Sequence, residues 1–141
     1  MKIEKLSEEA IKLAKKIEKS NGAVEVKDVQ LEGGEYAGYD LLSIYPNGKK
    51  LKIEVKGATR FHGIPDPYIT EFDKETREMK ADYFYVFYFP RDEDEPKYGS
   101  KPIFYKIPKE AIKSNNLEIK EGWKIKKFKK VMDNFKQEFS L

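Results

Sequence analysis

The residues best suited to chemistry are two carboxylates and an amine: Asp40, Glu54 and Lys56. Two carboxylates held close together repel each other unless a divalent cation lies between them. Mg²⁺ prefers carboxylate and water oxygens, and it can polarise a phosphoryl oxygen or activate a bound water. An amine beside the metal can orient that water or stabilise charge that develops on the phosphate. The three residues therefore predict a minimal site for phosphodiester hydrolysis.

A predicted β-hairpin must position these side chains. Residues 38–57 read GYDLLSIYPNGKKLKIEVKG. Within them Asn47-Gly48 is a strong signal for a two-residue turn, because both residues tolerate positive φ. Side chains alternate between the two faces of a strand, so Glu54 and Lys56 share one face of the second strand.

Asp40 is harder to place beside Glu54. A regular hairpin around a two-residue turn pairs Asp40 with Val55, on the face away from Glu54. A shared metal then requires a bulge or a sharp twist near residues 38–40, and bulges are frequent next to active sites. The alternative is that Glu54 and the lysines around it form only the solvated face of an amphipathic strand.

The order of these features resembles a known superfamily. Gly-Tyr-Asp, a hairpin and then Ile-Glu-Val-Lys-Gly are similar to the PD-(D/E)XK nucleases, and within them to the NO VEIN-like and Mrr-like branches. The resemblance covers residues 8–90, with the motif in 38–60. It implies a restriction-endonuclease-like α/β fold, with a mixed sheet of four to five strands flanked by helices.

The resemblance also implies roles for individual residues. Asp40 and Glu54 would bind the metal together with the Val55 carbonyl oxygen, and Lys56 would position or activate the attacking water. An acidic residue of the first helix often assists in the resembled families. Glu18 is the matching candidate and Glu9 the second, the alternative being an ordinary surface glutamate that pairs with a nearby lysine.

Apolar periodicity and turn residues divide the remaining chain into elements. Ser7 is the expected N-cap of the first helix, and Asn21-Gly22 its end. The aromatic run before Pro90 is too apolar for an exposed strand and predicts a central one, parallel to the strand that carries Glu54. The expected elements are helix 7–20, strands 23–30, 82–89 and 102–107, and helices 71–80, 108–113 and 126–139.

Several residues are candidates for contact with nucleic acid. Arg60, in an expected loop 58–69, could bind a phosphate. His62 in the same loop could be a general base, but it is expected to face solvent. The resemblance implies that Thr70 and Lys74 shape the phosphate site, although Thr70 also fits a plain helix cap. A lysine cluster at the start of the last helix could hold a phosphate backbone, or could be only a solvated face. It comprises Lys124, Lys126, Lys127, Lys129 and Lys130, of which Lys126, Lys127 and Lys130 are the candidate contacts.

Composition narrows the classes of function. The 141 residues fit a single domain, 1–141, with a core over about 8–107 and a basic amphipathic helix at the C-terminal end. The absence of cysteine excludes disulfides, thiolate zinc sites and cysteine nucleophiles, and a single histidine excludes a multi-histidine metal site. No membrane-length apolar run or signal pattern is present, which predicts a cytoplasmic protein. The high Lys, Glu and Ile content is typical of thermophiles.

These observations predict a Mg²⁺-dependent nuclease that acts on DNA, with Mn²⁺ as a substitute metal. A homodimer is plausible because cutting both strands needs two sites, and neither a membrane nor an organic cofactor is expected. Two alternatives remain at this level. The first is a catalytically inactive nucleic-acid-binding or accessory module of the same fold, and the second is an interaction protein whose charged strand face is merely solvated.

Overall fold

A mixed β-sheet forms the centre of the computed structural model, which describes residues 3–29, 39–60, 80–91, 96–98, 101–114 and 132–138. The strand order is β1-β2-β3-β4-β5-β6, and only β3 and β4 run parallel. This confirms the predicted α/β class and is consistent with a restriction-endonuclease-like fold, with six strands in the described ranges rather than four to five. In chain order the elements are α1 (Ile3–Ser20), β1 (Glu25–Asp28), β2 (Leu41–Ile44), β3 (Lys50–Arg60), β4 (Tyr83–Pro90), β5 (Ile103–Pro108), α2 (Lys109–Ser114), the 3₁₀ helix η2 (Asp133–Phe135) and β6 (Lys136–Gln137).

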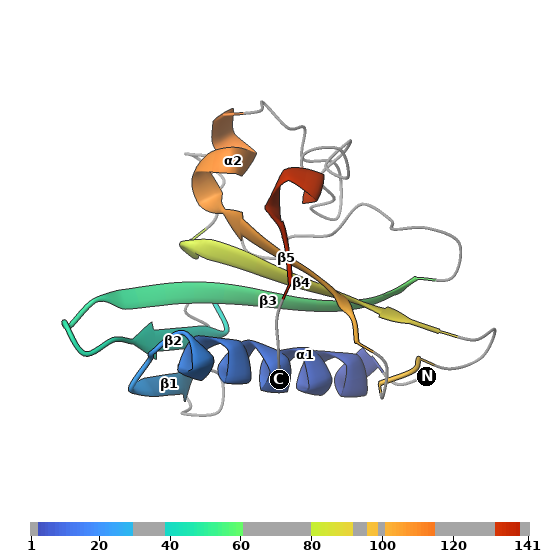
Figure 1. Ribbon diagram of the computed structural model, residues 1–141, viewed down its shortest axis with the longest axis horizontal. Coiled ribbons are helices and arrows are strands. Elements are labelled where there is room, and N and C mark those ends of the chain that lie inside the picture. Colours follow the sequence, from blue (N-terminus) through green and yellow to red (C-terminus); the bar gives the residue numbers. More distant parts are fainter. Residues whose placement is uncertain are drawn as a thin grey trace.

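Helices lie on both faces of this sheet. In Figure 1, α1 runs along one face and α2 lies beyond the other. Two buried clusters correspond to the two faces. The α1-side cluster joins Leu6, Ala10, Ala14 and Ile17 to alternate residues of the sheet. The α2-side cluster contains Ala111 of α2 and Met132, with the other set of alternate residues.

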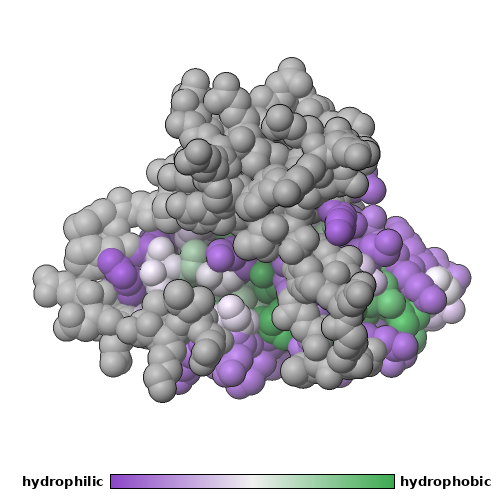
Figure 2. All heavy atoms as spheres, turned by 180° about the vertical axis from the view of Figure 1, so that it is seen from behind, coloured by the Kyte–Doolittle hydropathy of each residue, from purple (hydrophilic) through white to green (hydrophobic). Residues whose placement is uncertain are grey.

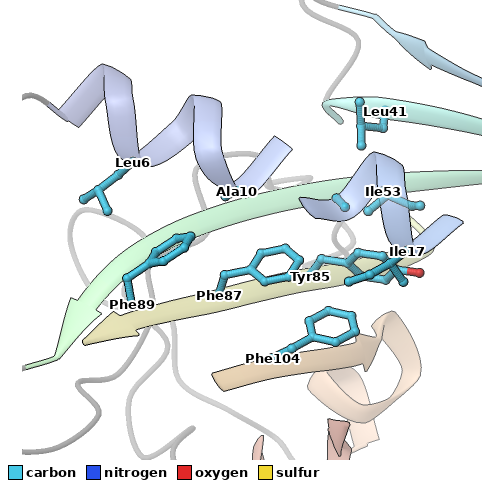
Figure 3. Packing of buried hydrophobic residues seen from close by; sticks show 10 residues of the cluster. Leu6, Ala10, Ile17, Leu41, Ile53, Tyr85, Phe87, Phe89 and Phe104 are labelled. Carbon is cyan, nitrogen blue, oxygen red and sulfur yellow. The ribbon is translucent and has the colours of Figure 1, made fainter. Parts of the chain in front are cut away.

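The core of the α1 side is largely aromatic. Figure 3 shows rings along β4 that face the small and branched residues of α1. Phe87 stacks on Phe104 of β5 with ring centroids 4.8 Å apart, and Tyr85 meets the same ring edge-on at 5.1 Å. Tyr85 and Tyr88 are fully buried, so the prediction of a central strand is confirmed and neither ring is available to stack on a nucleobase.

Helix α1 begins four residues earlier than predicted. It starts at Ile3, so Ser7 lies inside the helix and is not its N-cap. The reason is Leu6, which extends the apolar stripe by one turn and is itself buried. The C-terminal end agrees with the prediction: Gly22 has φ +105°, and the pattern of backbone bonds is a Schellman motif. No helix in the described ranges combines the length and apolar character needed to span a bilayer.

Gly57 allows α1 to lie directly on β3. A Cβ atom at this position would stand 2.6 Å from the Leu6 carbonyl oxygen and 3.1 Å from the Cβ of Ala10. The first contact involves backbone, which cannot rotate away, so a side chain at Gly57 would force the helix off the strand. The glycine that ends the Ile-Glu-Val-Lys-Gly motif is therefore required by helix packing on the face opposite Glu54.

Glu18 ties the end of α1 to the sheet. Its side chain is completely buried and accepts two hydrogen bonds, from the Tyr45 hydroxyl at 2.6 Å and from the Tyr85 hydroxyl at 2.5 Å. Burial, followed by the bond to Glu18, raises the pKa of Tyr45 to about 12. Burial and the charge of Glu18 also raise the pKa of Tyr85. Both tyrosines therefore remain donors to Glu18 well above neutral pH.

Other boundaries differ from the predictions where long-range pairing decides them. Strand β3 continues through Arg60 because residues 57–60 pair with β4, so the start of the expected loop 58–69 is strand. The expected helix 126–139 ends earlier than predicted: Met132 and η2 are helical, but the chain becomes extended at Lys136 and pairs with β5 as β6. Strand β5 is therefore not the edge of the sheet. Of the expected helix 71–80, residues 71–79 lie outside the described residues, and Lys80 forms a bend.

Replacing Gly57 with alanine is expected to destabilise the fold. Overpacking of this kind typically lowers the free energy of unfolding by about 1–3 kcal/mol, measurable by urea denaturation. Hydrogen exchange should also accelerate in α1. Gly48→Ala is a suitable comparison, because a Cβ there meets nothing within 4 Å and the cost comes only from φ +84°. An unchanged unfolding free energy in Gly57→Ala would contradict the close contact.

Tyr45→Phe should lower the free energy of unfolding and make it depend less on pH in the alkaline range. Loss of one donor to buried Glu18 should cost about 1–3 kcal/mol. In the native protein the raised pKa of Tyr45 contributes stability that is complete below pH 10 and is lost as the pH rises to about 12. Between these pH values the melting temperature should thus fall less steeply with pH in Tyr45→Phe than in the native protein. Tyr39→Phe on the other face is the control, and an identical slope in both variants would refute this assignment.

Candidate active site

The turn between β2 and β3 has three residues rather than the predicted two. Tyr45 N donates to the Lys49 carbonyl and Gly48 N donates to the Tyr45 carbonyl, each at 2.9 Å. Gly48 has φ +84°, so the loop Pro46-Asn47-Gly48 has the features of a type I turn followed by a bulge. The extra residue shifts the register by one, and Leu41 pairs with Ile53. If this register continued for one more pair, Asp40 would lie opposite Glu54 and not opposite Val55.

A bulge then brings Asp40 to the edge of β3. The Asp40 amide donates to the Ile53 carbonyl at 2.9 Å, although Ile53 is already the register partner of Leu41. Two consecutive residues therefore oppose one, which is the arrangement of a β-bulge. The bulge that the sequence predicted before the first hairpin strand is thus present, although the longer turn had already moved Asp40 out of register with Val55.

The Asp40 carboxylate takes the place of a main-chain acceptor. Its Oδ2 accepts a hydrogen bond from the Val55 amide at 2.7 Å. That amide belongs to the peptide group joining Glu54 to Val55, and strand amides point within the plane of the sheet. The carboxylate consequently lies beside the backbone of Glu54, at the edge where β2 has ended.

Glu54 and Lys56 point toward the α2 side of the sheet. Their register partners in β4 are Phe84 and Val86, both members of the α2-side cluster, whereas Ile53 belongs to the α1-side cluster. Glu54 is only 5% exposed and Asp40 only 8%; Lys56 is half-buried. Two buried carboxylates and an amine therefore come from one hairpin, as predicted.

The donor set fits a hard cation that keeps several waters. No three Asp, Glu, His or Cys side chains gather into a metal-binding group within the described ranges. A cation here would take two carboxylates and a backbone oxygen, with water completing its shell, which is how Mg²⁺ is commonly held. The Val55 carbonyl is directed to the correct edge, because the N–H and C=O of one strand residue point to the same side.

Glu18 does not converge with Asp40 and Glu54. It lies on the α1 side, where it accepts hydrogen bonds from Tyr45 and Tyr85, while Glu54 lies on the α2 side. The predicted assistance to the metal does not fit this placement. Glu9, the second candidate, is also on α1 and pairs with Lys12 at 3.7 Å.

Arg60 lies on the same face as Glu54 and Lys56, at the end of β3 and not in a loop. Its Nε is buried and has no hydrogen-bond partner among the described residues. The charges of Asp133 and Arg60 both act on Tyr105, whose pKa is raised mainly by burial. The other predicted contacts, together with His62, lie outside the described residues: Thr70, Lys74, Lys126, Lys127 and Lys130.

Asp82 is a positioning residue that the sequence reasoning missed. Its Oδ2 accepts from the Lys52 amide at 2.9 Å, and its own amide donates to the Lys52 carbonyl at 2.8 Å. Its carbonyl accepts from the Lys109 amide at 3.1 Å, where α2 begins. Asp82 therefore links β4 and α2 to β3 at Lys52, which is two residues before Glu54. An aspartate directly before an aromatic strand was the available signal, because Asp side chains readily bond backbone amides.

Comparison with known proteins gives one family. The family model described as "Protein NO VEIN, C-terminal" matches residues 7–100, which is about two thirds of the chain and includes α1, the hairpin and β4. Searches of the curated proteins and of the solved structures return no match. Since this match covers more than half of the chain, the chain belongs to the family of the NO VEIN C-terminal domain.

Proposed function

We propose that this protein is a Mg²⁺-dependent nuclease of the PD-(D/E)XK type that hydrolyses phosphodiester bonds in DNA. The observation that carries the proposal is the hydrogen bond from the Val55 amide to Asp40. It holds a buried carboxylate against the backbone of Glu54, with Lys56 two residues further on the same face as Glu54. The NO VEIN family match is associated with nuclease-related domains and supports the same assignment.

In this proposal each residue has a distinct task. Asp40, Glu54 and the Val55 carbonyl would hold the cation, which when bound supplies Lewis-acid stabilisation of the phosphate and a more acidic water. Lys56 would orient the attacking water and stabilise charge on the phosphoryl oxygens. The water oxygen would form a bond to phosphorus in line as the bond to the leaving oxygen breaks. The attacking water would release one proton to solvent, and the leaving oxygen would take up one proton from solvent.

Binding of the DNA backbone would use cations beyond Lys56. Arg60 continues the same face of β3, so a phosphate one or two nucleotides from the cut would be within its reach. Thr70, Lys74, Lys126, Lys127 and Lys130 remain proposed contacts on the basis of the sequence alone. Such contacts add affinity that falls with salt and carry no sequence preference.

Replacement of Glu54 by Gln or of Lys56 by Met should remove cleavage. We expect plasmid and oligonucleotide cleavage to require Mg²⁺ or Mn²⁺ and to stop on addition of EDTA. Each variant should lower the cleavage rate by roughly 10²–10⁴-fold, the range typical for loss of a proton-transfer or charge-stabilising group. Lys50→Met, on the exposed start of the same strand, is the matched control and should cleave normally.

The same variants separate metal binding from catalysis. Isothermal titration with Mn²⁺ should show loss of binding in Asp40→Asn and Glu54→Gln, but retained binding in Lys56→Met, because the lysine is not a ligand. DNA binding without cleavage in the native protein would favour the accessory-module alternative. Cleavage that survives Lys56→Met would refute the role given to that lysine.

A further inference from the structure

We propose that an open pocket on the α1 side of the sheet binds a small anion with a flat apolar body, of the nucleoside monophosphate class. The pocket has a volume of about 560 Å³ and lies between the end of α1, the β2–β3 turn and the start of β4. Its lining includes Tyr45, Lys49, Leu51, Tyr83 and Lys106. In the rear view of Figure 2 the end of the molecule that carries this turn is mainly hydrophilic, with a smaller hydrophobic area beside it.

This pocket is separate from the candidate active site. Leu51 and Tyr83 pack against the α1-side cluster, while Glu54 and Lys56 point to the α2 side. The sheet itself therefore lies between the two sites. The inference consequently stands independently of the proposed nuclease activity.

The apolar part of a ligand would meet rigid walls. Tyr45 is held in place because its hydroxyl donates to Glu18 at 2.6 Å. Tyr83 packs edge-on against Tyr85, with ring centroids 6.5 Å apart. Leu51 completes this part of the lining. Aromatic rings held in this way suit a planar group such as a nucleobase, since every base has a π-face that can stack on a ring.

The charge of the pocket favours an anion. Among the described residues, Lys49 and Lys106 belong to its lining and no carboxylate does. Lys106 Nζ lies 4.8 Å from the centroid of Tyr83 and 5.9 Å from that of Tyr85, so cation–π contacts hold the amine near the aromatic wall. A phosphate placed beside both ammonium groups would form charge-assisted hydrogen bonds.

Two features near the pocket carry negative charge and oppose the binding of an anion, but both are already engaged in hydrogen bonds within the protein. Glu18 lies behind the wall, but both of its oxygens already accept tyrosine hydroxyls. The C-terminal end of α1 presents a partial negative charge. Its carbonyls at Ile17, Glu18 and Lys19 are already bonded to backbone amides, so they are not free to attract a cation.

The size of the pocket limits the occupant. Small-molecule sites commonly measure about 300–1,000 Å³, and this pocket can hold one nucleotide but not a duplex. Either a free nucleotide or the phosphorylated end of a nucleic-acid strand offers this chemistry. Full affinity is expected to need both the phosphate and the base, because the lysines that would bind the phosphate and the rings that would stack on the base line the same pocket.

The test titrates the full chain with deoxyadenosine monophosphate in the presence of EDTA. NMR should show shifts of the Gly22, Leu51 and Lys106 amides. Deoxyadenosine and inorganic phosphate should each bind at least about tenfold more weakly than the nucleotide. A 5′-phosphorylated trinucleotide that binds more tightly than the nucleotide supports a strand end as the source, and weaker binding supports a free nucleotide.

Matched variants connect the binding to the pocket. Lys106→Met and Lys49→Met should each weaken nucleotide binding about tenfold, whereas Lys16→Met on the exposed side of α1 and Glu54→Gln should leave it unchanged. Lys49 lies on an exposed turn, so its variant decides the question if Lys106→Met fails to fold. Normal binding by Lys49→Met, equal binding of deoxyadenosine, or no shifts in these amides at millimolar nucleotide would overturn the proposal.

Discussion

The hydrogen bond from the Val55 amide to Asp40 joins the architecture of the sheet to the chemistry of the site. At this point β2 has ended, and a carboxylate oxygen replaces the main-chain acceptor that another strand residue would supply. The bond satisfies a strand donor that would otherwise lose its partner, which is costly when buried. It also fixes the position of an acid at an edge where the neighbouring carbonyl points the same way, so in the proposed site this one contact would both stabilise the sheet and place a metal ligand.

The two faces of strand β3 have different roles: one packs against α1, and the other carries the candidate site residues. On the α1 side, Gly57 leaves room for the Leu6 backbone. On the α2 side, Glu54 and Lys56 have Phe84 and Val86 as their register partners in β4. The rigid packing of α1 against this strand limits how far the strand can move, and buried acids need such rigidity because a small displacement would change their separation strongly. Asp82 adds a second constraint by aligning β3 with β4 just before Glu54.

Much of the fold could be predicted from local pattern, and the errors came from contacts between distant segments. The first helix, the hairpin and the aromatic strand follow from periodicity and turn residues. The turn length did not, because Asn47-Gly48 suits both a two-residue turn and a three-residue loop with Gly48 at the left-handed position. Helix α1 starts early because Leu6, near its beginning, is buried against the sheet. Strand β6 exists only because two residues pair with β5. No local signal tells that Glu18 meets Tyr45 and Tyr85, which are 27 and 67 residues away.

The parallel pairing of β3 with β4 has a consequence for the order of assembly. The Asp40 contact closes a span of only 15 residues within one hairpin, whereas the parallel ladder and the Glu18–Tyr85 contact join far more distant segments. Closing a longer loop costs more chain entropy before any contact rewards it. On this ground we expect the hairpin that carries Asp40 and Glu54 to form before the nonlocal core that packs around it.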